Sequence, residues 1–125
     1  MLRAWTFVSA AGRIAIGAGM MLAPVQALEA LGFQRPDRST ITVGRIAGVR
    51  DIVLGVHLAE ASRDSERLRR AHLFCAAADA GDSVAFAALL DSREMRVTAY
   101  KGLAAAAPAT VLGLWAAVST HRFKS

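Results

Sequence analysis

The segment from Gly44 to His57 constrains the fold most, because it combines the small residues of a helix interface with charges in an apolar stretch. Its glycines and one aspartate recur at helical spacing, so on a helix they form a narrow stripe that another helix can approach closely. The stripe consists of Gly44, Gly48, Asp51 and Gly55. Arg45 and Arg50 lie in the same segment, and an apolar environment must supply partners for them.

The composition predicts an all-α chain with a single domain over residues 1–125. Hydrophobic residues make up 54% of the sequence, the mean hydropathy is +0.37, and strand signals are nearly absent. The class could be a membrane protein or a soluble bundle, depending on whether the apolar surface faces lipid or a protein core.

Four apolar segments have the length of membrane spans, at about residues 4–23, 40–61, 71–90 and 97–120. A hydrocarbon core of about 30 Å needs roughly 20 helical residues. The last segment contains nineteen consecutive residues without a charge, 102–120. A short amphipathic helix at 24–31 is expected to lie along the membrane surface. The sequence therefore predicts a four-helix transmembrane bundle with short charged connections.

A water-soluble helical bundle with an apolar pocket is the alternative fold. It would need one polar face on each helix, but the charges cluster in the connections and near the middle of the segments. The lipid bilayer is therefore the expected environment. We expect no nucleic-acid partner despite the net charge of +5, because no basic face interleaved with aromatic residues is present.

The basic residues of the connections predict the orientation. With both termini in the cytoplasm, the inner side collects seven basic residues and the outer side five. The positive-inside rule then favours an inner-membrane, multi-pass protein with cytoplasmic termini.

Charged residues recur at similar depth in the first three segments. Unpaired charges at several such positions would oppose insertion, whereas arginine–carboxylate pairs in the bundle interior remove most of the cost. The sequence therefore predicts an ionic cluster of Arg13, Arg50, Asp51, Asp79 and Asp82. Arg45, nearer the outer surface, is included among the candidate binding residues. The segment 97–120 is expected to pack through its alanines and glycines.

The cluster permits a structural and a functional interpretation. It can fix helix register alone, or it can line a pocket or a path for a proton or substrate. Asp79 and Asp82 are three residues apart and could share a proton, which suits acid–base chemistry. No residue is assigned as catalytic, and whether the chain is an enzyme stays open.

His72 and Cys75 share a helical face with Asp79 and Asp82, an arrangement that could also indicate a metal site. The spacing matches no common metal signature, and nearby arginines would repel a cation. We therefore expect neither a metal nor a cofactor. His57 and His72 are expected near the inner membrane surface.

The order of these motifs resembles a family of small four-span bacterial membrane proteins of unknown function, frequent in actinobacteria. The resemblance rests on Arg13 after a glycine, on Asp79-x-x-Asp82, and on the Arg-Asp-x-x-x-Gly signature formed by Arg50, Asp51 and Gly55. It covers about residues 13–114 and implies a fold and a location, without an activity.

These observations predict a binding or interaction component of the membrane. Self-association or contact with a membrane partner is expected through the second or fourth span. The alternative is a membrane-embedded enzyme or small transporter that uses an intramembrane aspartate for proton transfer.

Overall fold

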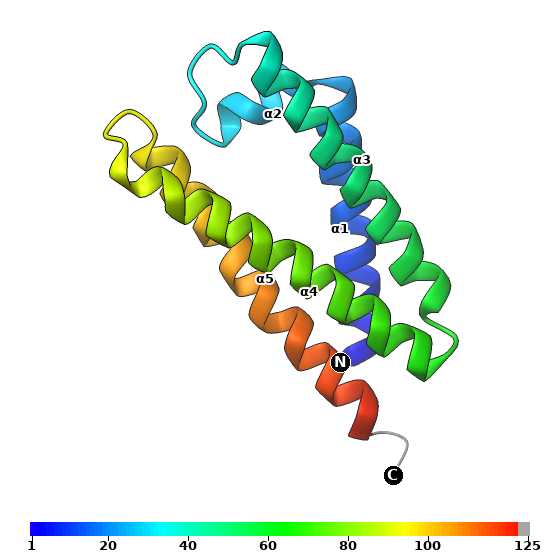
Figure 1. The fold of residues 1–125 in the computed structure, drawn as a ribbon. Coiled ribbons are helices and arrows are strands. Elements are labelled where there is room, and N and C mark those ends of the chain that lie inside the picture. The colour runs from blue at the N-terminus through cyan, green and yellow to red at the C-terminus, as the bar shows by residue number, and fades with distance from the viewer. Residues whose placement is uncertain (123–125) are drawn as a thin grey trace.

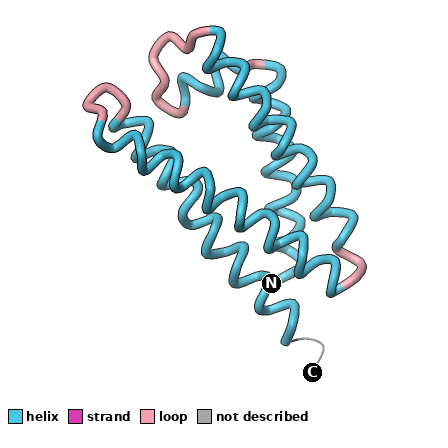
Figure 2. The backbone as a smooth tube through the Cα atoms, in the orientation of Figure 1, coloured by secondary structure: helices cyan, strands magenta, loops and turns pink. Residues whose placement is uncertain are grey.

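A computed structural model describes residues 1–122, and every regular element in that range is a helix (Figures 1 and 2). The elements are α1 (Leu2–Leu22), α2 (Pro24–Ala30), α3 (Arg38–Ala61), α4 (Ser65–Ala88), the short 3-10 helix η1 (Leu89–Asp91) and α5 (Arg96–Arg122). The all-α prediction is confirmed.

Aspartates begin the two central helices. The Asp37 side chain accepts a hydrogen bond from the Thr40 backbone N–H at 2.8 Å, and Asp64 accepts one from Arg67 at the same distance. Each carboxylate satisfies a backbone donor that the first helical turn leaves without a partner. Helix α4 therefore begins at Ser65, inside the charged stretch that the sequence assigned to a connection before residue 71.

The helices form two antiparallel hairpins, α1 with α3 and α4 with α5. Figure 1 shows the hairpins meeting near the N-terminus and the α3–α4 connection, and diverging toward α2. At the wide end, Lys101 of α5 donates a hydrogen bond from Nζ to the Ala30 carbonyl oxygen at 3.2 Å. Gly32 follows at φ +95°, a conformation that favours glycine, and packs against Thr98. Helix α2 and its exit thus link the two hairpins.

Small residues set the close approach inside each hairpin. A Cβ added to Gly48 would lie 2.9 Å from the Gly17 carbonyl oxygen, and one on Gly55 would lie 2.8 Å from that of Ala10. In the other hairpin, a Cβ on Gly113 would meet Ala76 at 3.1 Å. The glycines of α3 therefore face α1, and this stripe serves the internal packing of the chain.

The distribution of apolar side chains is reversed relative to that of a water-soluble domain. Among residues 1–122, eight of the thirteen buried hydrophobic residues are alanines. Large apolar side chains lie outside on all four long helices, including Phe7 of α1, Val53 of α3, Val84 of α4 and Val111 of α5. Outward apolar bulk and inward small residues are typical of helices packed in lipid.

Three helices are long and apolar enough to cross a membrane: Leu2–Leu22, Ser65–Asp91 and Arg96–Thr120. Helix α3 is not among them, because its charged residues reduce its apolar character. The structure thus supports three of the four predicted spans by length and composition. Length and composition alone do not identify α3 as a span.

Candidate functional site: an ion-pair cluster between three helices

Five charged side chains from α1, α3 and α4 form a continuous series of ion pairs. In order of contact the series is Asp79, Arg13, Asp51, Arg50 and Asp82. The structure thus brings together five of the six candidate binding residues. Because the series joins α1 and α3 to α4, it connects the two hairpins.

Arg13 forms the closed end of this ion-pair cluster. Its Nη1 donates to Asp51 Oδ1 at 3.2 Å, and its Nη2 donates to Asp79 Oδ2 and to the Cys75 carbonyl oxygen. The side chains of Arg13 and Asp79 are only 11% and 10% exposed. One guanidinium on α1 therefore fixes the positions of α3 and α4.

Arg50 forms the open end of the cluster. Its Nη1 and Nη2 donate to the two carboxylate oxygens of Asp82 at 2.7 and 2.8 Å, and Nη2 also lies 3.2 Å from Asp51 Oδ1. Two parallel hydrogen bonds give this pair a defined geometry. Both side chains are nonetheless about one-third exposed, at 36% and 33%. Exposure therefore increases along the series from Arg13 to Arg50.

The cluster contains two guanidiniums and three carboxylates, so it carries one excess negative charge when all groups are ionised. Asp51 lies between the arginines and accepts a hydrogen bond from each through one oxygen, Oδ1. The Nε atoms of Arg13 and Arg50 are buried without an acceptor in the part of the chain that the structure describes. The hydrogen-bonding capacity of the arginines is therefore incompletely used.

Arg45 lies outside the cluster, in contrast to its inclusion among the candidate residues. Its side chain is exposed on α3 and forms no ion pair within residues 1–122. Five residues separate it from Arg50, which at 3.6 residues per turn rotates it by about 140° around the helix axis. A position in the same apolar segment therefore does not bring the Arg45 side chain to the face of the cluster.

The residues considered for a metal site have other contacts. Within the described residues, no group of three or more His, Cys, Asp and Glu side chains is arranged to hold a metal ion. His72 is buried, with Nε2 lying 3.1 Å from Thr6 Oγ1, and Cys75 is buried beside the cluster. His57 is exposed, and its ring lies 6.3 Å from that of Phe74.

The contact between Thr6 and His72 is a polar site that the sequence analysis missed. Thr6 precedes Arg13 by seven residues and His72 precedes Asp79 by seven, so each pair occupies one helical face two turns apart. The parallel spacing places Thr6 against His72 just as it places Arg13 against Asp79. The signal available in the sequence was a polar residue two helical turns before a charged residue in an apolar segment.

Fold and site together define the class of the protein. It is an all-helical chain with three helices apolar enough to cross a membrane and an ion-pair cluster that connects its two hairpins. No family model, curated protein or solved structure matches the chain.

Proposed function

We propose that this chain is a four-span membrane protein acting as a binding or interaction component, with α3 as the additional span. The surface of α3 supports this proposal, because its outward face is a continuous apolar row. The row consists of Val43, Ile46, Val49, Val53 and Val56, which are between 43% and 66% exposed. Two of the charges of α3, on Arg50 and Asp51, are paired in the cluster and so cost less in lipid.

Arg45 is compatible with a crossing by α3. It lies seven residues after Arg38, about 10 Å from the start of the helix at 1.5 Å per residue. A long arginine side chain at that depth extends its charged end toward the membrane surface. The membrane is the bacterial inner membrane, with both termini cytoplasmic, and the chain belongs with the small four-span proteins that its motifs resemble.

The open end of the cluster is the proposed binding site. Arg50 and Asp82 hold each other through two hydrogen bonds and are three times as exposed as Arg13 and Asp79. This difference in exposure is the observation that carries the proposal. A ligand or partner that offers a carboxylate to Arg50, or a hydrogen-bond donor to Asp82, finds a polar, preorganised pair in an otherwise apolar surface.

Cysteine accessibility tests this proposal without replacing any of the five charged residues of the cluster. In a Cys75→Ala background, Ala78→Cys places a thiol one helical turn before Asp82, on the same face and partly exposed. Val84→Cys is the matched control, because Val84 is 72% exposed on the apolar surface of the same helix. A water-soluble maleimide should label the Ala78→Cys variant in membranes and leave the Val84→Cys variant unlabelled. Equal protection of both thiols would contradict a polar binding site at Asp82.

A membrane-embedded enzyme or transporter is the second candidate. The excess carboxylate favours it, because a cluster with one uncompensated negative charge favours the uptake of a proton or another cation. In this case Asp82→Asn abolishes function in cells while the abundance of the protein is unchanged. If the cluster only holds the helices together, loss of function follows loss of abundance.

The outward apolar side chains argue against the soluble-bundle alternative. A chain with Phe7, Val84 and Val111 on its surface would expose too large an apolar area to water. Alkaline carbonate extraction separates the cases: an integral protein stays in the membrane pellet, and a soluble bundle is released.

A further inference from the structure

A cavity at the narrow end of the molecule is distinct from the ion-pair cluster. Its volume is about 530 Å³, and it lies between the start of α1, the end of α3 and the start of α4. Its apolar wall includes Phe7, Ala59 and Leu68. The rim carries Arg3 and Arg63, and none of the lining residues is acidic.

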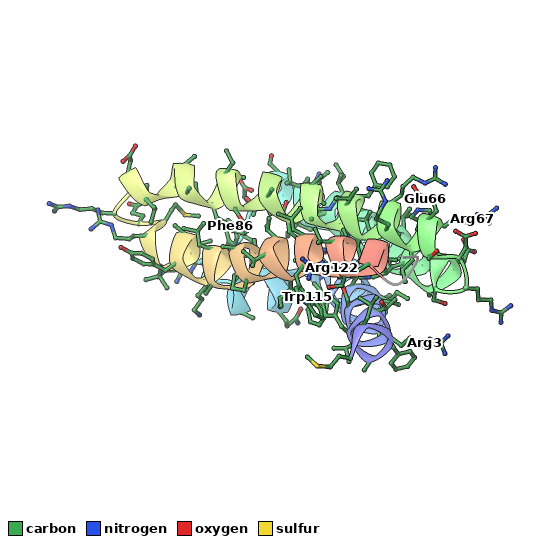
Figure 3. All side chains as sticks on the ribbon, turned by 90° about the horizontal axis from the view of Figure 1, so that it is seen from below. Arg3, Glu66, Arg67, Phe86, Trp115 and Arg122 are labelled. Carbon is green, nitrogen blue, oxygen red and sulfur yellow. The ribbon has the colours of Figure 1, made fainter. Side chains whose placement is uncertain are left out.

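The two arginines of the cavity are available to a ligand. Both are exposed, and neither forms an ion pair within the described chain. Figure 3, viewed from this end of the molecule, shows Arg3 on α1 and Arg67 on α4 on the same side. Arg3 and Arg63 thus place two positive charges at a cavity whose wall is apolar.

The place of the cavity indicates what kind of molecule fits it. It lies where α1 begins and α3 ends, which is the cytoplasmic membrane boundary in the proposed topology. Basic pockets between helices at that level bind the headgroups of anionic lipids. A second cavity of about 280 Å³ at the same end also combines two arginines with apolar residues, but its Arg69 is already paired with Glu66.

We infer that the larger cavity binds one anionic phospholipid. Arg3 and Arg63 pair with the headgroup phosphate, and the acyl chain lies along Phe7 and Leu68. The chemistry required is a negative phosphate joined to an apolar chain, which matches the two halves of the lining. The inference rests on the proposed membrane topology for its location, and the binding itself is measurable without it.

Native mass spectrometry of the detergent-purified full chain tests the inference, with phosphatidylglycerol and phosphatidylcholine as probes. The wild-type protein should bind phosphatidylglycerol about tenfold more tightly, because this lipid has a net negative charge, whereas the choline cation of phosphatidylcholine offsets its phosphate and is repelled by the two arginines. Arg3→Gln with Arg63→Gln should remove this preference. The matched control, Arg38→Gln with Arg93→Gln, removes the same charge from exposed residues at the other end and should retain it.

A steric variant separates the cavity from general surface charge. Ala59→Trp fills the cavity and leaves both arginines in place, so it should weaken phosphatidylglycerol binding to a similar extent. Circular dichroism verifies that each variant folds, and Ala59→Phe provides a smaller substitution should the tryptophan disturb the helix.

Several outcomes would overturn the inference. The first is equal binding of the two lipids by the wild-type protein, and the second is an equal loss of the phosphatidylglycerol preference in the Arg38→Gln, Arg93→Gln control. The others are an unchanged preference in folded Ala59 variants and full displacement of the lipid by inorganic phosphate. The failure of the proposed function is distinguishable from these. A chain released by carbonate that still prefers phosphatidylglycerol would refute the membrane proposal and retain the lipid site.

Discussion

Arg13 is the residue on which the packing of the two hairpins depends most directly. It extends from α1 and meets one carboxylate from α3 and one from α4. Buried ion pairs contribute little compared with well-packed apolar residues, but removal of one member leaves the other charge buried without compensation. The arrangement is therefore sensitive to changes at Arg13 in particular.

Arg13→Gln should destabilise the protein by about 3 to 5 kcal/mol, because it leaves Asp51 and Asp79 with less compensation in a closed site. Denaturant or thermal unfolding in detergent micelles measures this change. Arg45→Gln is the matched control and should alter stability by less than about 0.5 kcal/mol, as exposed substitutions usually do. Equal destabilisation by the two variants would show that Arg13 has no special structural role.

The sequence could predict the members of the cluster but not which way each side chain points. Arg13, Arg50, Asp51, Asp79 and Asp82 follow from the need to neutralise charges at a common depth in apolar segments. Arg45 lies nearer the start of α3 and is rotated away from the cluster, so its place in the same apolar segment did not make it a member. The contact between Thr6 and His72 depends on the rotation of α1 against α4, which spacing within one segment does not determine.

At the scale of the helices, glycine determines how closely α1 and α3 approach. Gly17 and Gly48 face each other through their backbones, and a Cβ at Gly17 would lie 2.5 Å from the Gly48 carbonyl oxygen. The pattern in α3 was visible in the sequence as Gly44, Gly48 and Gly55. Its partner could not be identified, since such a stripe serves a neighbouring span or a second copy equally well.

Gly17→Ala should destabilise the α1–α3 hairpin by about 1 to 3 kcal/mol, the usual cost of forcing extra volume into a packed interface. Gly19→Ala is the control in the same helix, because nothing lies within 4 Å of an added Cβ there. It should leave stability unchanged or raise it slightly through the helix propensity of alanine. Unfolding in micelles compares the two, and a neutral Gly17→Ala variant would contradict the close packing.

The start of α3 should respond to acid. The Thr40 backbone N–H donates to Asp37, and this hydrogen bond lowers the pKa of Asp37 below its ordinary value of 3.8. A lowered pKa means that the capping contribution is complete above the ordinary value and is lost as the pH falls through the folded value. Amide exchange at residues 39–41, corrected for its intrinsic pH dependence, should therefore show fraying in acid.

Asp37→Asn provides the control for this acid response, since asparagine caps a helix without a titrating group. Its first turn should exchange at the same corrected rate across the acidic range. An identical pH response in the wild-type protein and this variant would assign the fraying to another group.

Some helix boundaries could be predicted from the sequence and others could not. The short amphipathic helix was expected at 24–31 and occupies Pro24–Ala30, because proline begins a helix and Gly32 supplies the turn that follows. The start of α4 was placed too late, because its first turns are rich in arginine. Those residues remain helical once Asp64 caps them and an exposed pair, Arg69 with Glu66, forms on the surface.

On the scale of the whole molecule, the apolar outer surface and the ion pairs between the hairpins fit the same environment, a lipid bilayer. Alanines and glycines let the helices approach, large side chains face outward, and the ion pairs lie where the hairpins meet. In water this arrangement would expose a large apolar surface to solvent. In a bilayer the outward apolar side chains contact lipid, and the charged side chains between the helices pair with each other. Helix α3 determines whether this interpretation holds, because its outer face is apolar but the helix as a whole is not among those apolar enough to cross a membrane.

The sidedness of the two connections that flank α3 tests this account most directly. Alkaline phosphatase fused after Arg35 reports the connection before α3, and the same reporter fused after Arg63 reports the connection after it. If α3 crosses the membrane, the fusion at Arg35 is active outside the cytoplasm and the fusion at Arg63 is inactive. Equal activity of the two fusions would place both connections on one side and contradict the four-span arrangement.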